Sequence, residues 1–458
     1  MRFVLENVGP LRQAQVELGD ITVICGENNT GKTYAAYTLY GFLKKARQVS
    51  MPFEISEAQF SQLFQSGRLA IRYEQEKLVA MMRKMFSEAS REYALELSDT
   101  LACSFDALSE ASVSAEFFEE DFALMGRRMN SAIHVSTDLS AVLNINVRRG
   151  VINIHLNNRE HKEILEGVYM REWISDAVTR IFVKQLFPDT FIASVERTGI
   201  EIFRDEISLA RDSFLEDMIG SVRSGRQLKL PSNYPLPIRD NLKSLLRFRQ
   251  IRADHLSPVV VEYPQILTDF ADIIGGEYVI DSMMGVRYQP AGSDLSLSMA
   301  ESSSAVRSLL LIGLYIKHMA NFGNLLIMDE PEMNLHPNNQ RRMTRLFARL
   351  ANAGVRVLIT THSDYILKEL DALILMNRNA PRMRKIMEQE GYDARELLKA
   401  SQVKLYTTQE SSPTKDGALA RYVLNQTPVS QELGTTPKCF DETIDAMNRL
   451  FDEIAWGK

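Results

Sequence analysis

Residues 26–33 read Gly26-Glu27-Asn28-Asn29-Thr30-Gly31-Lys32-Thr33 and match the phosphate-loop pattern G-x-x-x-x-G-K-[ST]. The apolar run Ile21–Cys25 precedes this loop and is expected to form a strand, and a helix is expected from about Lys32 to Lys45. The glycines allow a tight loop whose N–H groups face phosphate oxygens, and the helix points its positive end at the same place. A chance match in a loop rich in Gly and Asn is the alternative. The flanking strand and helix favour a phosphate site.

The residues of this loop are predicted to bind both the phosphates and Mg²⁺. Lys32 is expected to reach the β- and γ-phosphates, and the Thr33 hydroxyl to bind Mg²⁺. The loop residues predicted to surround the phosphates are Gly26, Asn28, Asn29, Thr30 and Gly31.

A second apolar strand, Leu325–Met328, ends in two carboxylates, Asp329 and Glu330. Asp329 is predicted to hold Mg²⁺, directly or through water, and Glu330 to orient and polarise an attacking water. A strand that runs into an acidic turn is common by itself. The phosphate loop upstream favours the catalytic interpretation.

The segment after this strand carries a family resemblance. Residues Asp329-Glu330-Pro331-Glu332-Met333-Asn334-Leu335-His336-Pro337 resemble the D-E-P-E-x-x-L-H-P segment of ABC-type ATPases in the SMC, RecF and OLD (overcoming lysogenisation defect) branch. The resemblance implies that Asp329 and Glu330 end the Walker B strand and that 334–337 lie at an interface between two ATPase heads. His336 is expected to have a structural rather than a catalytic role.

Two further segments are similar to motifs of the same branch. Val357–Ser363 resembles its T-T-H-S switch, which implies that His362 contacts the γ-phosphate. Ser302–Ser308 resembles the S-S-G-x-[KR]-S signature, which implies that Ser304 reaches the γ-phosphate held by the opposite subunit. A serine N-cap is the alternative for this second segment. Ala305 stands where the family has glycine, so slow or partner-gated hydrolysis is left open.

Two other features of the family are harder to locate. Residues 195–199, Val-Glu-Arg-Thr-Gly, partly match a P-A-x-R-[ST]-G segment and lack its Pro-Ala. The glutamine that follows the first lobe in these enzymes has four candidates: Gln59, Gln62, Gln65 and Gln265.

The predicted fold class is α/β: an ABC-type P-loop ATPase head with a mostly helical insertion between its two sequence halves. The halves are expected at 1–50 and 257–380, where apolar strands joined by a helix indicate a parallel sheet. The insertion, 51–256, is expected to be helical over 54–135 and 200–224 and to contain a β-hairpin at 142–156. A C-terminal α/β extension, 381–458, is expected to pack on the head, with a strand at 403–407 and an amphipathic helix at 440–454.

Composition limits the classes of protein. Of 458 residues, 45% are hydrophobic and 24% charged, which is ordinary for a globular chain. No apolar run approaches the roughly 18 residues of a membrane helix, so no membrane partner is expected. Three scattered cysteines suit a reducing cytoplasm, and a net charge of −6 gives no overall attraction to nucleic acid.

The resemblance implies ATP and Mg²⁺ as cofactors and a homodimer, or a larger even-numbered oligomer, that sandwiches ATP between subunits. OLD proteins carry a TOPRIM nuclease after the ATPase, but no Asp-x-Asp follows His362, so this nuclease is expected to be absent. The first hypothesis is therefore an ATPase that acts as sensor or scaffold of a prokaryotic anti-phage complex and controls a separate effector, a nuclease or toxin. In this it resembles the ATPase partners of Septu and PARIS systems.

The alternative hypothesis is a RecF- or SMC-like ATPase that binds DNA during repair. Its candidate basic residues are Arg223, Arg226, Lys229, Lys243, Arg247, Arg249 and Arg252. Acidic residues lie among them, so a solvated helix face is favoured. A transporter motor is disfavoured, because the D-E-P-E-x-x-L-H-P segment belongs to another branch.

Overall fold

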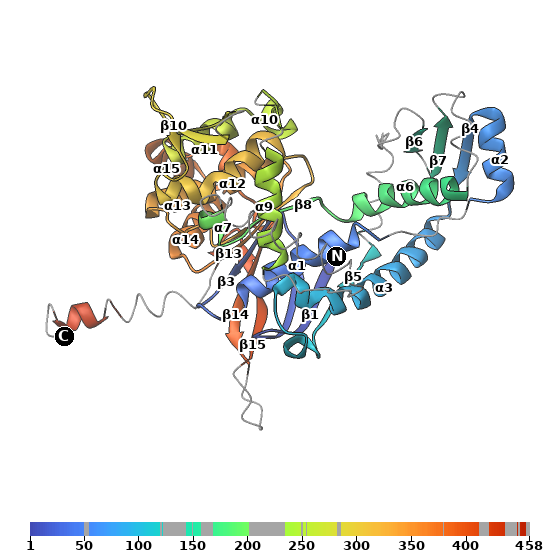
Figure 1. Ribbon diagram of the computed structural model, residues 1–458. Helices are drawn as coiled ribbons and strands as arrows, with labels where there is room; N and C mark the ends of the chain where they lie inside the picture. The colour runs from blue at the N-terminus through green and yellow to red at the C-terminus, as the bar shows by residue number, and fades with distance from the viewer. Residues whose placement is uncertain are drawn as a thin grey trace, which may run out of the picture. The chain divides into compact units, whose positions relative to one another are not determined.

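The computed structural model describes residues 1–49, 55–119, 121, 143–148, 150–156, 168–200, 234–248, 251–252, 254–281, 285–378, 380–411, 421–435, 447 and 449–454. The chain divides into two compact units (Figure 1). Unit 1 contains Met1–Val4, Phe42–Leu95 and Ser112–Asp189, and unit 2 contains Leu5–Gly41, Glu96–Ala111 and Thr190–Lys458.

A large mixed sheet forms the centre of unit 2. Its strands lie in the order β1 (Arg2–Val8), β2 (Leu11–Glu17), β15 (Tyr422–Thr427), β14 (Val403–Glu410), β3 (Ile21–Cys25), β13 (Arg356–Thr361), β12 (Leu325–Asp329) and β8 (Thr190–Ala193). The five strands from β14 to β8 are mutually parallel. The predicted α/β class, with a strand, the phosphate-loop motif and a helix in succession, is confirmed by this sheet.

The register of the parallel strands aligns their carboxyl ends. Thr361 of β13 and Thr407 of β14 both pair with Cys25 at the end of β3, and Asp329 at the end of β12 pairs with Thr360. The loops that follow these strands therefore leave the sheet at one edge, which is where ligands bind in open α/β sheets.

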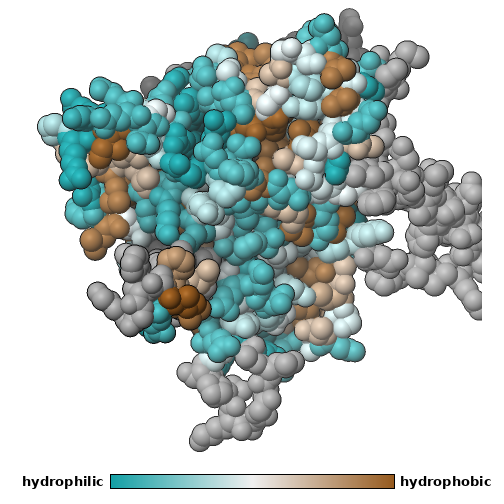
Figure 2. Space-filling model, turned by 90° about the vertical axis from the view of Figure 1, so that its left-hand side faces the viewer, coloured by the Kyte–Doolittle hydropathy of each residue, from teal (hydrophilic) through white to brown (hydrophobic). Residues whose placement is uncertain are grey.

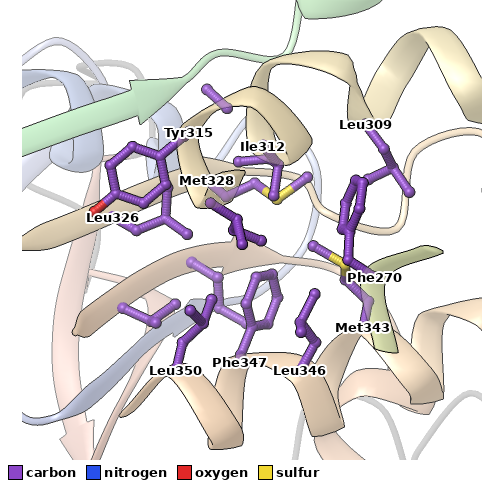
Figure 3. Close-up of a cluster of buried hydrophobic side chains, with 14 of the residues drawn as sticks. Phe270, Leu309, Ile312, Tyr315, Leu326, Met328, Met343, Leu346, Phe347 and Leu350 are labelled. Atoms are coloured by element: carbon purple, nitrogen blue, oxygen red, sulfur yellow. The ribbon is translucent and has the colours of Figure 1, made fainter. Parts of the chain in front are cut away.

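Helices cover the central strands, and every residue of β3 and β12 is buried. Parallel strands covered on both faces are apolar throughout, as these are. Figure 3 shows the resulting core, in which Met328 of β12 lies among side chains of α11 (Gln265–Ile274), α12 (Ser304–His318) and α13 (Pro337–Asn352).

Further elements complete unit 2. They are α7 (Arg197–Ile200), α9 (Leu236–Phe248), α10 (Pro258–Glu262), the sheet of β9 (Gly276–Asp281), β10 (Gly285–Pro290) and β11 (Leu297–Ser298), α14 (Asp364–Met376), α15 (Pro381–Glu390), and the short pair β16 (Val429–Ser430) and β17 (Gly434–Thr435). Helix α1 (Lys32–Ala46) follows the phosphate loop.

Unit 1 combines helices with a small sheet. Its elements are α2 (Glu57–Ser66), β4 (Arg68–Arg72), most of α3 (Gln75–Leu101), β5 (Ser112–Glu116), β6 (Leu143–Arg148), β7 (Val151–Leu156) and α6 (Val168–Leu186). Strands β4, β7 and β6 pair in that order, and aromatic rings such as Phe86 and Phe187, whose centroids are 4.7 Å apart, pack in the core.

The structure corrects two details of the insertion and the C-terminal region. The helical prediction for 54–135 missed β4 and β5, although Leu69 and Ile71 alternate with exposed residues as a half-buried strand requires. The hairpin predicted at 142–156 is present as β6 and β7. Beyond 380, β14 was expected, but β15, which pairs with it antiparallel, was not. The helix predicted at 200–224 lies outside the described residues.

The surface is predominantly polar where it can be seen. On the face drawn in Figure 2, hydrophilic residues predominate and hydrophobic residues gather in separate patches. Within the described part of the chain, no helix combines the length and the apolar character that crossing a membrane needs.

The core of unit 2 gives a first prediction. Leu350 is fully buried, whereas Leu295 is 62% exposed. Replacing Leu350 with Ala removes buried methyl groups and leaves a cavity, so we expect the free energy of unfolding to fall by about 2–5 kcal/mol. The matched change Leu295→Ala should alter it by less than about 0.5 kcal/mol. Urea unfolding followed by circular dichroism measures both, and equal losses would contradict the assigned core.

Candidate functional site

The loop after β3 adopts the backbone that its residue types allow. Gly26, Asn29 and Gly31 have φ values of 148°, 63° and 95°, in the region that side chains other than Gly and Asn disfavour. Asn28 and Asn29 are exposed, and Thr30 and Gly31 are buried. The predicted phosphate-binding residues therefore form one tight turn between β3 and α1.

A residue of β14 holds this turn in place. The Thr408 hydroxyl donates to Oγ1 of Thr30 (2.8 Å), and Thr30 donates in turn to the carbonyl of Glu27 (2.8 Å). A Cβ placed on Gly26 would lie 1.9 Å from Oγ1 of Thr408, so only glycine fits at that position. Sequence reasoning missed Thr408, because only the pairing of β14 with β3 brings it to the loop.

Lys32 lies inside the loop rather than in solvent. It is 5% exposed, and its Nζ donates to the carbonyls of Gly26 (3.0 Å) and Glu27 (2.6 Å). Burial lowers the pKa of Lys32, and the carboxylates of Glu330, Glu332 and Asp329 partly oppose this. The ammonium is thus oriented by the loop and close to the acidic strand end.

Asp329 is the most deeply buried acid of the site. It is 0% exposed, and its Oδ1 accepts from the hydroxyls of Thr33 (3.2 Å) and Thr360. Its Oδ2 is buried and makes no hydrogen bond within the described structure. Desolvation raises the pKa of Asp329 to about 6, although the two hydroxyls lower it. A buried carboxylate oxygen without a donor suits a hard cation.

Thr33 and Asp329 therefore fit the predicted Mg²⁺ site. No group of three or more His, Cys, Asp or Glu residues arranged to hold a metal occurs among the described residues. Mg²⁺ in nucleotide sites is usually held by one or two protein oxygens together with phosphates and water.

Glu330 has a constrained backbone. Its φ is 48°, which is uncommon for a residue with a side chain. Its N–H points at Thr360, whose carbonyl and hydroxyl lie 3.2 and 3.1 Å away. Its side chain is 24% exposed, so the carboxylate can meet water at the edge of the site.

His362 is placed by Glu332. Oε1 of Glu332 accepts from the hydroxyl of Thr361 (2.8 Å) and the N–H of His362 (2.7 Å), and lies 3.3 Å from Nδ1 of His362. The same Nδ1 is 3.7 Å from Oε1 of Glu330. The structure thus brings together the histidine and the glutamate predicted to be catalytic. Glu332, part of the motif but given no role from sequence, contacts the histidine.

The segment from 334 to 337 turns back toward α7 and then starts α13. Asn334, with φ 61°, donates to the hydroxyl of Thr198 (3.3 Å). His336 is the N-cap of α13, and its Nδ1 accepts from the N–H of Asn338 (3.3 Å). This contact agrees with the structural role expected for His336.

The two serines at the start of α12 differ. Ser303 is the N-cap and accepts from the N–H of Val306 (3.3 Å), whereas Ser304 is the first helical residue and is exposed. The side chain of Ser304 is therefore available at a helix N-terminus, where anions bind well. Its role toward a second subunit stays a prediction.

The partial match at 195–199 is part of the same site. Arg197 is 2% exposed and donates to the main-chain carbonyls of Asp329 (2.5 Å) and Glu330 (2.6 Å). Tyr37 of α1 donates to Oε2 of Glu196 (3.2 Å). In the sequence, the partial match to P-A-x-R-[ST]-G was the indication that this segment belongs to the site. Among the described residues, no hydrogen bond connects the candidate glutamines to this site. Gln59 accepts from the N–H of Ser56 at the start of α2, and Gln265 donates to Asp269.

A phosphate-loop motif, a buried acidic strand end and a second polar strand end at one sheet edge are the features of a P-loop nucleotide-binding domain. The chain belongs to the AAA ATPase domain family, whose model matches residues 1–186 and 227–367, more than half of its length.

A curated relative is similar over a shorter stretch. The OLD nuclease of Thermus scotoductus is 24% identical over an alignment of 186 residues, which covers 37% of this chain and 34% of that protein. The chain thus matches about a third of the length of this relative.

Solved structures of SMC heads align along most of the chain. An SmcHead bound to the C-winged helix domain of ScpA is 12% identical and covers 93% of this chain and 97% of its own, with a TM-score of 0.33. The SMC head domain from Thermotoga maritima is 11% identical, with coverages of 94% and 98% and a TM-score of 0.30. Likeness at this level does not establish how this chain acts.

The buried Asp329 gives a prediction about pH. Its pKa of about 6 lies above the ordinary 3.8, so the native state binds this proton more tightly than the unfolded chain does. In metal-free protein the contribution of Asp329 to the free energy of unfolding should fall as pH rises from about 3.8 to about 6, by about 3 kcal/mol in total. Asp329→Asn should therefore be more stable than wild type above pH 6 and lose this advantage as pH falls.

Urea unfolding in EDTA, without nucleotide, across this pH range measures the difference. Asp294→Asn, at an exposed site, serves as the control and should show no such trend. A difference between Asp329→Asn and wild type that does not vary with pH would contradict the assignment.

Proposed function

We propose that this protein binds ATP with Mg²⁺ and hydrolyses it at the carboxyl edge of the unit 2 sheet. The observation that carries the proposal is the state of Asp329. One oxygen of this buried carboxylate accepts from Thr33, and the other has no donor within the described structure. Thr33 and Asp329 would hold Mg²⁺, which would supply positive charge beside the phosphates that Lys32 would meet.

The remaining residues suit an in-line attack of water on the γ-phosphate. Glu330, partly exposed and near Nδ1 of His362, would orient the water and polarise it. His362, whose backbone and ring are both held by Glu332, would contact the γ-phosphate. The P-loop reaction depends mostly on positioning and charge, which is what these contacts provide.

Two substitutions test the proposed site. Lys32→Ala removes the cation that meets the phosphates, so ATP should no longer raise the unfolding temperature. Glu330→Gln should keep ATP binding and lower kcat by about 10²–10⁴-fold, because the group that orients and polarises the water is lost. Phosphate release and thermal shift measure both.

Matched controls lie on α15, where Lys385→Ala and Glu388→Gln change exposed side chains. They should behave as wild type. Hydrolysis at the wild-type rate in Lys32→Ala or Glu330→Gln would refute the site.

The proposal includes a homodimer, or a larger even-numbered assembly, in which ATP lies between subunits. Ser304 of one copy would face the ATP bound by Lys32 of the other. The exposure of Ser304 at the N-terminus of α12 supports this arrangement. Ala305 in the signature segment fits slow or partner-gated hydrolysis.

The proposed biological role is that of a sensor or scaffold in an anti-phage defence complex with a separate effector. The motif resemblance and the similarity to part of an OLD nuclease support it. The alternative is a RecF- or SMC-like ATPase that binds DNA. Of its candidate basic residues, Lys243 and Arg252 lie 3.4 and 2.9 Å from Asp240 and Asp254, which lowers the positive charge they offer to DNA.

Affinity purification of Glu330→Gln with ATP, from cells that carry the neighbouring genes, separates these roles. The variant should hold the ATP-bound assembly, so mass spectrometry and a nucleic-acid stain can identify what stays bound. A stoichiometric protein encoded beside it, without DNA, is the result expected for a sensor with an effector. DNA without a protein partner would overturn the defence role in favour of repair.

A further inference from the structure

Arg197 makes an unusual set of contacts for a buried arginine. Its Nε donates to the carbonyl of Ser308 (2.9 Å), and its Nη1 to the carbonyl of Ser194 (3.0 Å). Nη1 also donates to the carbonyl of Asp329 (2.5 Å), and Nη2 to that of Glu330 (2.6 Å). These four contacts all end on main-chain carbonyls and connect the end of β8, the end of β12 and helix α12.

We propose that Arg197 is a positioning residue for ATP hydrolysis, which fixes the backbone of Asp329 and Glu330 against α12. The inference rests on the proposed function, since it concerns how the same site is kept in working geometry. Among the described residues, the four hydrogen bonds of the Arg197 side chain all end on carbonyls and none on a carboxylate. Arg197 acts through the peptide units that carry the two acids.

The choice of acceptors supports a positioning role. A buried guanidinium is costly unless its donors are satisfied, and burial lowers the pKa of Arg197 accordingly. The nearby acids, Asp329 first, oppose this shift through space. Because the guanidinium bonds carbonyls and leaves the carboxylate of Asp329 unpaired, its charge stabilises the site without competing for the oxygen offered to Mg²⁺.

The constrained residue Glu330 lies between two clamps. On its amide side, the N–H of Glu330 meets the carbonyl and hydroxyl of Thr360. On its other side, Arg197 bonds the carbonyl of the same residue. A non-glycine residue with φ 48° persists only where its surroundings fix it, and these two contacts do so.

Helix α12 is the third element that Arg197 holds. Ser308 lies four residues, about one turn, after Ser304, the residue proposed to face the ATP of a second copy. A shift of this helix therefore moves an acceptor of Arg197, and with it the group that orients Asp329 and Glu330. Thr198, which follows Arg197 in the chain, accepts from Asn334, so the segment that carries Arg197 also contacts the chain after β12.

Steady-state kinetics of Arg197→Lys test the proposal. A lysine ammonium keeps the charge but cannot span four carbonyls. We expect kcat for ATP to fall about 10²-fold, as for small misplacements of catalytic groups, and KM to change less than about threefold. Arg349→Lys is the matched control: Arg349 is also largely buried and bonded, to Asp269 and Glu396, away from the nucleotide site. It should lower the unfolding temperature and leave kcat unchanged.

A double-mutant cycle separates positioning from general stability. If Arg197 acts through Asp329 and Glu330, Arg197→Lys should lower the single-turnover rate less in the Glu330→Gln background than in wild type. Additive losses would overturn the proposal, as would an unchanged kcat in folded Arg197→Lys. Arg197→Gln, which carries no buried charge, replaces the lysine variant if that fails to fold.

The proposed hydrolysis itself can fail separately. If the wild-type protein shows no ATP turnover that depends on Lys32, the proposed function and this inference are both contradicted. Wild-type turnover that Arg197→Lys leaves intact would remove only the inference.

Discussion

The buried carboxylate of Asp329 is the constraint around which the site is arranged. A charge in this position loses its water, and only one of its oxygens regains hydrogen bonds, from Thr33 and Thr360. The protein therefore carries an unfavourable term at the end of β12, which the raised pKa of this acid reflects. Strongly shifted pKa values of this kind cluster at functional sites, and under the proposed function the binding of Mg²⁺ would remove the cost.

Strand register provides the geometry for this arrangement. The parallel pairing of β14, β3, β13 and β12 brings Thr408, Cys25, Thr361 and Asp329 to one edge, although they are far apart in the chain. A slip in register would move the switch strand β13 relative to the acidic strand, and His362 would leave Glu330. The buried apolar strands that form the core in Figure 3 therefore also fix the site.

The sequence predicted the local parts of the site and missed the non-local ones. Lys32, Asp329 and His362 each stand next to an apolar strand, so motif and strand could be recognised together. Thr408 has no motif, and its contact depends on a strand pairing that local patterns do not encode. The same reason explains why β15 was missed and why β4, paired with β7 some eighty residues later, was taken for helix. Glu332 stood within a recognised motif, but its bonds to Thr361 and His362 appear only once β12 and β13 pair.

The position of Lys32 also leaves the carboxylate of Asp329 without an ion pair to the lysine. An ammonium close to Asp329 could form an ion pair with it, and Mg²⁺ would then have to displace the lysine. The loop prevents this, because the carbonyls of Gly26 and Glu27 accept from Nζ and satisfy it. These neutral acceptors bind an ammonium less strongly than a carboxylate does, so phosphate oxygens can replace them at modest cost. Lys32, Asp329 and Arg197 thus share one feature: main-chain or hydroxyl groups, and not opposite charges, form their hydrogen bonds. Under the proposed function, this leaves Lys32 for the phosphates and Asp329 for the metal.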